Sequence, residues 1–119
     1  MKIIIAGSRT MSFSSYPLIA QSVKRSGFDV TEVGCGMADG ADTFGMKWAY
    51  EQEPKIPVEK FPADWGHYGR RAGYMRNIIM GNWADGLIVL IWGESKGSMN
   101  MLEIMQNLNK PCYVLYDGN

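Results

Sequence analysis

The sequence is poor in the residues that build disulfide frameworks and metal sites. It holds two cysteines, Cys35 and Cys112, and a single histidine, His67, and none of them lies at metal-ligand spacing. Two such cysteines do not make a disulfide framework, so we expect free thiols in a cytoplasmic protein. No metal and no cofactor is expected.

Net charge and long apolar runs are also lacking. Twelve lysines and arginines balance twelve aspartates and glutamates, so no net field attracts nucleic acid or an anionic membrane. No apolar run is long enough to span a membrane, and Met1-Lys2 leads directly into a predicted strand rather than a signal peptide. We therefore expect no membrane partner and regard nucleic acid as an unlikely partner.

The apolar pattern predicts an α/β fold in one domain that spans residues 1–119. Short apolar runs predict five strands, and between them lie four stretches with helical spacing. The first helix is expected to be capped at Ser14-Ser15, and a later one is expected to turn Met75, Ile79 and Trp83 toward the sheet. Such alternation predicts a three-layer, Rossmann-like domain with a five-stranded parallel sheet. The expected strands cover residues 3–6, 28–33, 57–61, 86–91 and 112–116.

Glycine-rich and cationic loops follow the predicted strands. Right-handed crossovers place all of these loops at the carboxyl edge of the sheet. Four of the five arginines fall in them, a concentration that favours a binding site for a phosphate-bearing ligand. Nearby aromatic side chains either stack a base of that ligand or pack against the sheet. The arginines are Arg9, Arg70, Arg71 and Arg76, and the aromatics are Trp65, Tyr68, Tyr74 and Trp92.

The loop after the apolar run 86–91 is the strongest of these signals. It holds Gly93 and then opens a helix near Gly97-Ser98, where backbone N–H groups lack partners and the helix dipole favours an anion. Lys96 adds a positive charge, and Ser98 adds a hydroxyl. A tight turn followed by an ordinary serine cap is the alternative interpretation.

Five segments together resemble the SLOG superfamily, the Rossmann-like proteins related to the lonely-guy phosphoribohydrolases and to the DNA-processing protein DprA. The match is best with the small YspA-type branch, which is found in bacteria and phages. The segments are IIIAGSRT at 3–10, GMADGAD at 36–42, FPADW at 61–65, AGYMRN at 72–77 and WGESKGS at 92–98. The resemblance implies a nucleotide-ligand-binding domain that forms a homodimer or a larger homo-oligomer.

Ligand-binding residues follow from this resemblance by position. The first loop supplies Gly7, Ser8 and Arg9, and the second supplies Gly36, Gly40 and Asp42. Later loops supply the remaining candidates, which are Arg76, Asn77, Gly93, Lys96, Gly97 and Ser98.

The chain departs from the lonely-guy enzymes at their catalytic glutamate. Ser98 stands at the threonine of their motif, and three residues later the chain has Met101, which has no proton chemistry. Glu103 lies about 200° further round the helix. Glu94 and Asp42 are the remaining acid–base candidates. Glu94 is alternatively an exposed loop acid, and Asp42 either accepts a ribose hydroxyl or stabilises the helix dipole.

Three functions follow in order of expectation. The first is binding of a nucleotide-derived small molecule, of ADP-ribose, cyclic-nucleotide or nucleoside phosphate type, as a sensor or sponge. The second is hydrolysis of an N-glycosidic or phosphoester bond in a nucleotide. The third is binding of single-stranded nucleic acid, as in DprA. Arg76 is the central candidate, with a structural ion pair to Asp64 or Asp85 as its alternative role.

Overall fold

The computed structural model describes residues 1–37 and 40–116, so two residues of the quoted segment 36–42 lie outside it. Five parallel strands form one sheet in the order β3-β2-β1-β4-β5, which confirms the predicted α/β class. The strands are β1 (Lys2–Gly7), β2 (Glu32–Cys35), β3 (Val58–Lys60), β4 (Gly86–Ile91) and β5 (Cys112–Tyr116).

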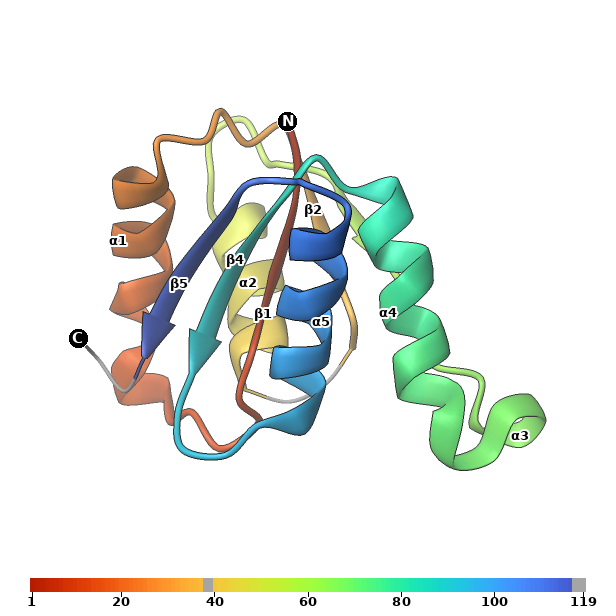
Figure 1. Ribbon diagram of the computed structural model, residues 1–119. Helices are drawn as coiled ribbons and strands as arrows, with labels where there is room; N and C mark the ends of the chain where they lie inside the picture. The colour runs from red at the N-terminus through yellow and green to blue at the C-terminus, as the bar shows by residue number, and fades with distance from the viewer. Residues whose placement is uncertain (38–39, 117–119) are drawn as a thin grey trace.

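Helices cover both faces of this sheet. The elements α1 (Pro17–Ser26) and α2 (Ala41–Tyr50) pack on one face, and α4 (Ala72–Trp83) and α5 (Lys96–Asn107) pack on the other. Figure 1 shows that all four helices begin at the same end of the molecule, where the strands end. A short helix α3 (Trp65–Tyr68) and the 3-10 turns η1 (Phe13–Ser15) and η2 (Gly69–Arg71) complete the described elements.

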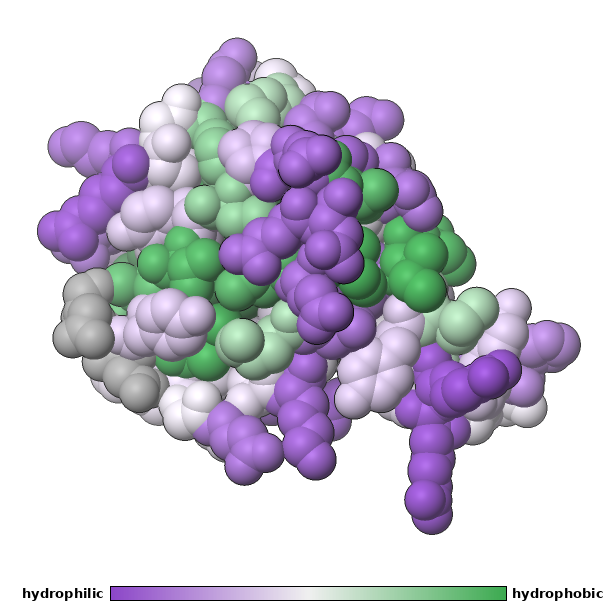
Figure 2. Space-filling view, in the orientation of Figure 1, coloured by the Kyte–Doolittle hydropathy of each residue, from purple (hydrophilic) through white to green (hydrophobic). Residues whose placement is uncertain are grey.

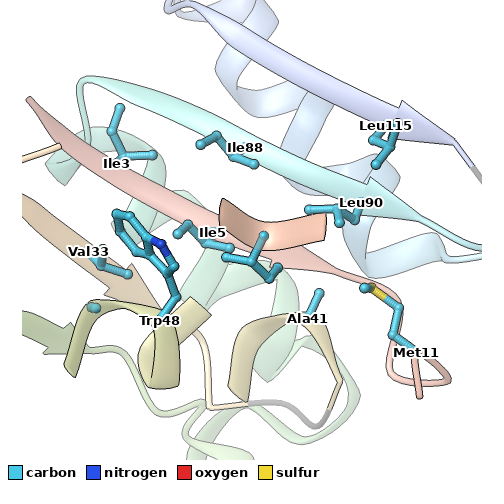
Figure 3. Packing of buried hydrophobic residues seen from close by; sticks show 11 residues of the cluster. Ile3, Ile5, Met11, Val33, Ala41, Trp48, Ile88, Leu90 and Leu115 are labelled. Atoms are coloured by element: carbon cyan, nitrogen blue, oxygen red, sulfur yellow. The ribbon is translucent and has the colours of Figure 1, made fainter. Parts of the chain in front are cut away.

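Side-chain alternation along the strands divides the core into two layers. In β1, Ile3 and Ile5 face α1 and α2, whereas Ile4 and Ala6 face α4 and α5. Figure 3 shows the first layer, in which Trp48 of α2 packs beside the strand side chains. The central strand β4 is buried along its whole length, as its continuous apolar run predicts.

Three local predictions are wrong. The second strand begins at Glu32, because the segment after the left-handed Gly27 first joins the sheet where Glu32 pairs with Lys2. Ser14 and Ser15 do not cap α1. They lie in η1, and α1 begins at Pro17 with no side-chain cap.

The third correction concerns the orientation of α4. Ile79 was expected to face the sheet but is 58% exposed, and its neighbour Ile78 is exposed as well. The side of α4 that packs inward is instead made of small, polar and flexible residues, which are Ala72, Asn77, Met80 and Gly81. No helix in the described part of the chain has the length and hydropathy to cross a membrane.

Candidate functional site

A cavity of about 340 Å³ opens at the carboxyl ends of the central strands. The β1–α1 loop, the starts of α2 and α5, and the middle of α4 surround it. The chain leaves β1 and β4 toward opposite faces of the sheet, and this arrangement opens a crevice in α/β folds.

Ten of the twelve predicted ligand-binding residues line this cavity. They come from four separate segments, as the shared position of the loops predicts. They are Gly7, Ser8, Arg9, Gly36, Asp42, Arg76, Asn77, Lys96, Gly97 and Ser98. Gly40 and Gly93 do not line it.

Arg76 projects from α4 over the cavity. Its guanidinium donates to the carbonyl oxygen of Gly36, and its Nε donates to Oδ1 of Asn77 at 3.0 Å. Partial burial lowers the pKa of Arg76, an effect that the nearby Asp42 carboxylate opposes. Because a guanidinium stays charged at neutral pH, this half-desolvated cation is well suited to hold an anion.

Gly36 lets the two charged groups of the cavity approach each other. A Cβ atom at this position would lie 2.8 Å from Oδ2 of Asp42 and 3.2 Å from Cζ of Arg76. Asp42 itself is only 6% exposed, so its carboxylate forms part of the wall beside the arginine.

Gly40 has a structural role next to the cavity. Its φ is +72°, and a Cβ atom there would lie 2.3 Å from the carbonyl oxygen of Ser8. The glycine therefore lets the start of α2 pack directly on the β1–α1 loop. Gly93, the other glycine outside the cavity, lines another hollow, of about 510 Å³, with Tyr74 and Tyr116.

Ser8 connects the two central loops. Its hydroxyl accepts from the backbone N–H of Trp92 at 2.7 Å and donates to the Trp92 carbonyl oxygen at 3.0 Å. Both bonds are made within the protein, so the Ser8 hydroxyl joins the β1–α1 loop to the end of β4 and is already occupied.

Asn77 is a second connecting residue. Its Nδ2 donates to the Gly97 carbonyl oxygen at 3.2 Å and to Oδ1 of Asn100 at 3.0 Å, while its Oδ1 accepts from Arg76. The amide thereby joins α4 to the start of α5 and orients the guanidinium. The structure thus assigns Asn77 a positioning role.

The start of α5 forms the opposite wall. The helix begins at Lys96 without a side-chain cap, and the hydroxyls of Ser95 and Ser98 bond to each other at 2.7 Å. The first backbone N–H groups of a helix have no partner within it. Together with the helix dipole they favour an anion at this wall.

A second hollow of about 330 Å³ adjoins the first. It shares Arg9, Gly36 and Arg76 with the cavity and extends it to Trp65, whose side chain is 55% exposed. Trp92, by contrast, packs against the core, which is the alternative that the sequence left open.

Arg70 and Arg71 do not join the other two arginines. They are exposed in η2, beyond the short helix α3, and line neither hollow. Figure 1 shows α3 extending away from the sheet, so this unexpected helix carries the pair outward. Asp64 caps α3 at 3.1 Å, and Asp85 accepts from the Lys2 N–H at 2.8 Å. Among the residues that the structure describes, neither carboxylate forms the ion pair with Arg76 that was the alternative role of this arginine.

The acid–base candidates occupy different positions. Glu94 is exposed at the rim, whereas Asp42 is buried in the wall. Met101 is buried in the cavity floor at the position of the lonely-guy glutamate. Burial raises the pKa of the Cys35 thiol, which therefore stays protonated, and His67 is exposed and packs against Tyr68. Among the described residues, no three His, Cys, Asp or Glu side chains group to hold a metal ion.

Four further residues of the cavity lining lie outside the set of predicted site residues. Thr10 and Ser95 directly adjoin predicted residues, and Met80 lies one helical turn after Arg76. That spacing is a signal that could have identified Met80. Ala6, at the end of β1, forms part of the wall.

Comparison with known proteins places this fold among DprA-like structures. No known family profile matches the chain. It is 28% identical over 116 residues to the Gene 61 protein of Mycobacterium phage D29, with 92% of each chain covered. Its structure is similar to DNA processing protein A (DprA) from Helicobacter pylori, with a TM-score of 0.65 at 17% identity, and to DprA from Streptococcus pneumoniae, with a TM-score of 0.55 at 13% identity.

The likeness covers almost all of this chain but only part of the DprA proteins. It includes 96% and 95% of this chain, but 64% of the Helicobacter chain and 58% of the Streptococcus chain. At these identities the shared property is the fold, a Rossmann-like domain of the kind that the SLOG resemblance implies.

These likenesses contradict two expectations. The Helicobacter protein binds single-stranded DNA, so nucleic acid was wrongly regarded as an unlikely partner. For the same reason, a nucleotide-derived small molecule is wrong as the leading ligand. Zero net charge is a sum over the chain. It does not describe the carboxyl edge, where Arg9, Arg76 and Lys96 outnumber the carboxylates of Asp42 and Glu94 in one cavity.

Proposed function

We propose that the chain binds single-stranded DNA at the carboxyl edge of the sheet. One observation carries the proposal: the exposed Trp65 ring shares a hollow with Arg9 and Arg76. Proteins that bind single strands combine cations for the backbone with aromatic faces for the bases. The DprA-like fold supports the same ligand, because the Helicobacter protein binds single-stranded DNA.

The cavity and the adjoining hollow would divide the ligand between them. Arg9, Arg76, Lys96 and the free N–H groups of α5 would hold phosphate oxygens in the cavity. Trp65 would stack a base in the adjoining hollow. Because every base has a face that can stack on an aromatic ring, the affinity for single-stranded DNA should depend little on the nucleotide sequence.

Titration of a fluorescently labelled decathymidylate, followed by anisotropy, tests this function. With three cations on phosphates, the plot of log K against log salt should have a slope of about −2. A duplex of the same length and thymidine monophosphate serve as comparisons. If the monophosphate binds as tightly as the decamer, or if no oligonucleotide binds, the proposal is wrong.

Replacing Trp65 with alanine should weaken binding of the decamer by about 1–3 kcal/mol, because one stacked base is lost. Stability should change little, since the ring is 55% exposed. Trp65→Phe should retain most of the affinity, and His67→Ala on the same short helix is the matched control. Equal losses in the Trp65→Ala and His67→Ala variants would remove Trp65 from the binding surface.

We further propose that α4 mediates the expected homo-oligomer. Its exposed side presents Tyr74, Ile78 and Ile79, and after Arg76 the helix carries no charged residue. Figure 2 shows the hydrophobic area over α4 at the right of the molecule. A solvent-facing helix normally carries charged residues, so this composition favours a covering partner. A second copy offers the same uncharged side.

Ile79→Glu should therefore shift the protein from dimer or larger assembly to monomer, because a carboxylate would be buried without a partner. Light scattering coupled to size exclusion measures the mass. Gln106→Glu, an equally charged change on the exposed side of α5, should leave the mass unchanged. A monomeric wild-type protein at high micromolar concentration would contradict the assignment.

The family branch, the phage source and the cellular location of the protein stay predictions. The YspA-type branch and a phage origin are supported by the phage relative of equal extent. The cytoplasmic location predicted from free thiols is compatible with a single-stranded DNA ligand.

A further inference from the structure

Three aromatic rings form a cluster on the α1–α2 side of the carboxyl edge. Phe13 of η1 stacks on Tyr16 with 5.4 Å between ring centroids and 6° between ring planes. Phe44 of α2 meets both rings edge to face, at 5.9 Å from Phe13 and 5.7 Å from Tyr16. Offset-stacked and edge-to-face contacts at these distances are favourable, so the Phe13 ring is held in one orientation.

Tyr16 is itself held in place. Its hydroxyl donates to the Glu51 carboxylate, Lys47 pairs with Glu51 at 3.0 Å, and the Lys47 ammonium lies 5.4 Å from the Tyr16 ring centroid. Burial and the bond to Glu51 raise the pKa of Tyr16 to about 12, so the phenol stays a donor at neutral pH. Phe13 therefore stacks on a tyrosine ring whose position is fixed.

Phe13 contributes little to the core. Tyr16 and Phe44 pack against the buried cluster, whereas Phe13 is 63% exposed, the largest exposure among the described large apolar residues. A single exposed apolar residue needs no explanation. An exposed ring that two other rings hold in position presents a rigid π-face to the solvent.

The position of Phe13 relates it to the candidate site. It follows Arg9 by four residues in the β1–α1 loop, a separation of at most about 14 Å. Met11, between them, is buried beside Leu90 and Ala41 and anchors the loop, as Figure 3 shows. The ring therefore keeps a fixed place near a cation that lines both hollows.

We propose that Phe13, supported by Tyr16 and Phe44, is a second stacking platform for a base of the bound single strand. The inference rests on the proposed function and extends it. Trp65 would stack a base of the DNA on the α4 side, and Phe13 would stack another on the α1 side. The cations of the cavity, which lie between them, would hold the phosphates of the DNA. Figure 1 shows α1 and α3 at opposite sides of the molecule, so a strand that reaches both platforms crosses the carboxyl edge.

The dependence of affinity on oligonucleotide length tests whether the bound strand reaches both platforms. Wild type, Phe13→Ala and Phe13→Trp are titrated by anisotropy with labelled oligothymidylates of two to ten nucleotides. Phe13→Ala should bind the decamer about fivefold to hundredfold more weakly than wild type, yet bind the shortest ligands equally well. Phe13→Trp should retain the affinity, because it restores a stacking face. Tyr50→Ala is the matched control, since Tyr50 is 43% exposed at the far end of α2.

Each outcome has one meaning. Equal affinity of wild type and Phe13→Ala at every length overturns the second platform while leaving the proposed function intact. An equal loss of affinity by Phe13→Ala at every oligonucleotide length, together with a lower melting temperature, also overturns the second platform, because that result indicates a structural role for Phe13. If wild type binds no oligonucleotide, the proposed function fails, and this inference fails with it.

Discussion

Arg76→Ala is expected to weaken binding of single-stranded decathymidylate by about 2–4 kcal/mol, or roughly 30-fold to 900-fold. The guanidinium lies half-buried between the two hollows that would hold the strand. A phosphate in the cavity would receive charge-assisted bonds from it and from the start of α5. Without the side chain, that phosphate would lie beside the Asp42 carboxylate with one compensating charge fewer.

Two variants separate position from charge in this experiment. Arg76→Lys should recover only part of the affinity, because an ammonium cannot reproduce the planar fork of donors. Arg25→Ala removes the same charge from the last turn of α1, at the other end of the molecule, and should change affinity slightly. Anisotropy measures affinity, and thermal melting checks the fold. If Arg76→Ala binds as tightly as wild type, the phosphate site lies elsewhere.

The sheet could be predicted because its signal is local. The uninterrupted apolar run at Gly86–Ile91 indicates a strand covered on both faces, and the structure buries all six residues. Once the strands and helices alternate, handedness alone places the loops at one edge. The resemblance to SLOG motifs selects individual residues within these loops, and ten of the twelve residues selected line one cavity.

The orientation of α4 could not be predicted from hydrophobicity. Helix α4 packs so closely against α5 that a Cβ atom on Gly81 would lie 2.7 Å from Cγ2 of Ile104. A contact this close selects glycine at position 81, while Ile78 and Ile79 stay exposed. Periodicity assigns the largest apolar residues to the core, so it fails where backbone proximity decides the packing.

The roles of individual site residues depend on partners that are distant in sequence. Ser8 bonds to Trp92, and Asn77 bonds to Gly97, so both polar side chains are used to assemble the cavity. Loop motifs identify such residues without distinguishing a ligand contact from a structural bond. The outward position of Arg70 and Arg71 could not be predicted from the loop motifs either, because it depends on the unexpected helix α3.

Gly7→Ala should destabilise the fold by about 3 kcal/mol or more, at the upper end of the cost of overpacking. An added Cβ atom would lie 2.1 Å from the Leu90 carbonyl oxygen and 2.8 Å from the Cβ of Ala41. Neither neighbour can yield easily. Leu90 is a backbone partner in β4, and the same oxygen accepts the N–H of Ser8 at 3.0 Å. The two central strands would have to separate at the cavity wall.

Chemical denaturation of Gly7→Ala should show a lower denaturant midpoint than wild type. Thermal denaturation should show a melting temperature about 10–15 °C below wild type. The matched control is Gly27→Ala, where φ is +73° but no heavy atom lies within 4 Å of the added Cβ. That change carries only the cost of a left-handed backbone, about 1 kcal/mol. The difference between the two variants isolates the contact with Leu90 from backbone strain. Equal stability losses would mean that β1 and β4 can separate at Gly7 without cost, and would contradict the expected overpacking.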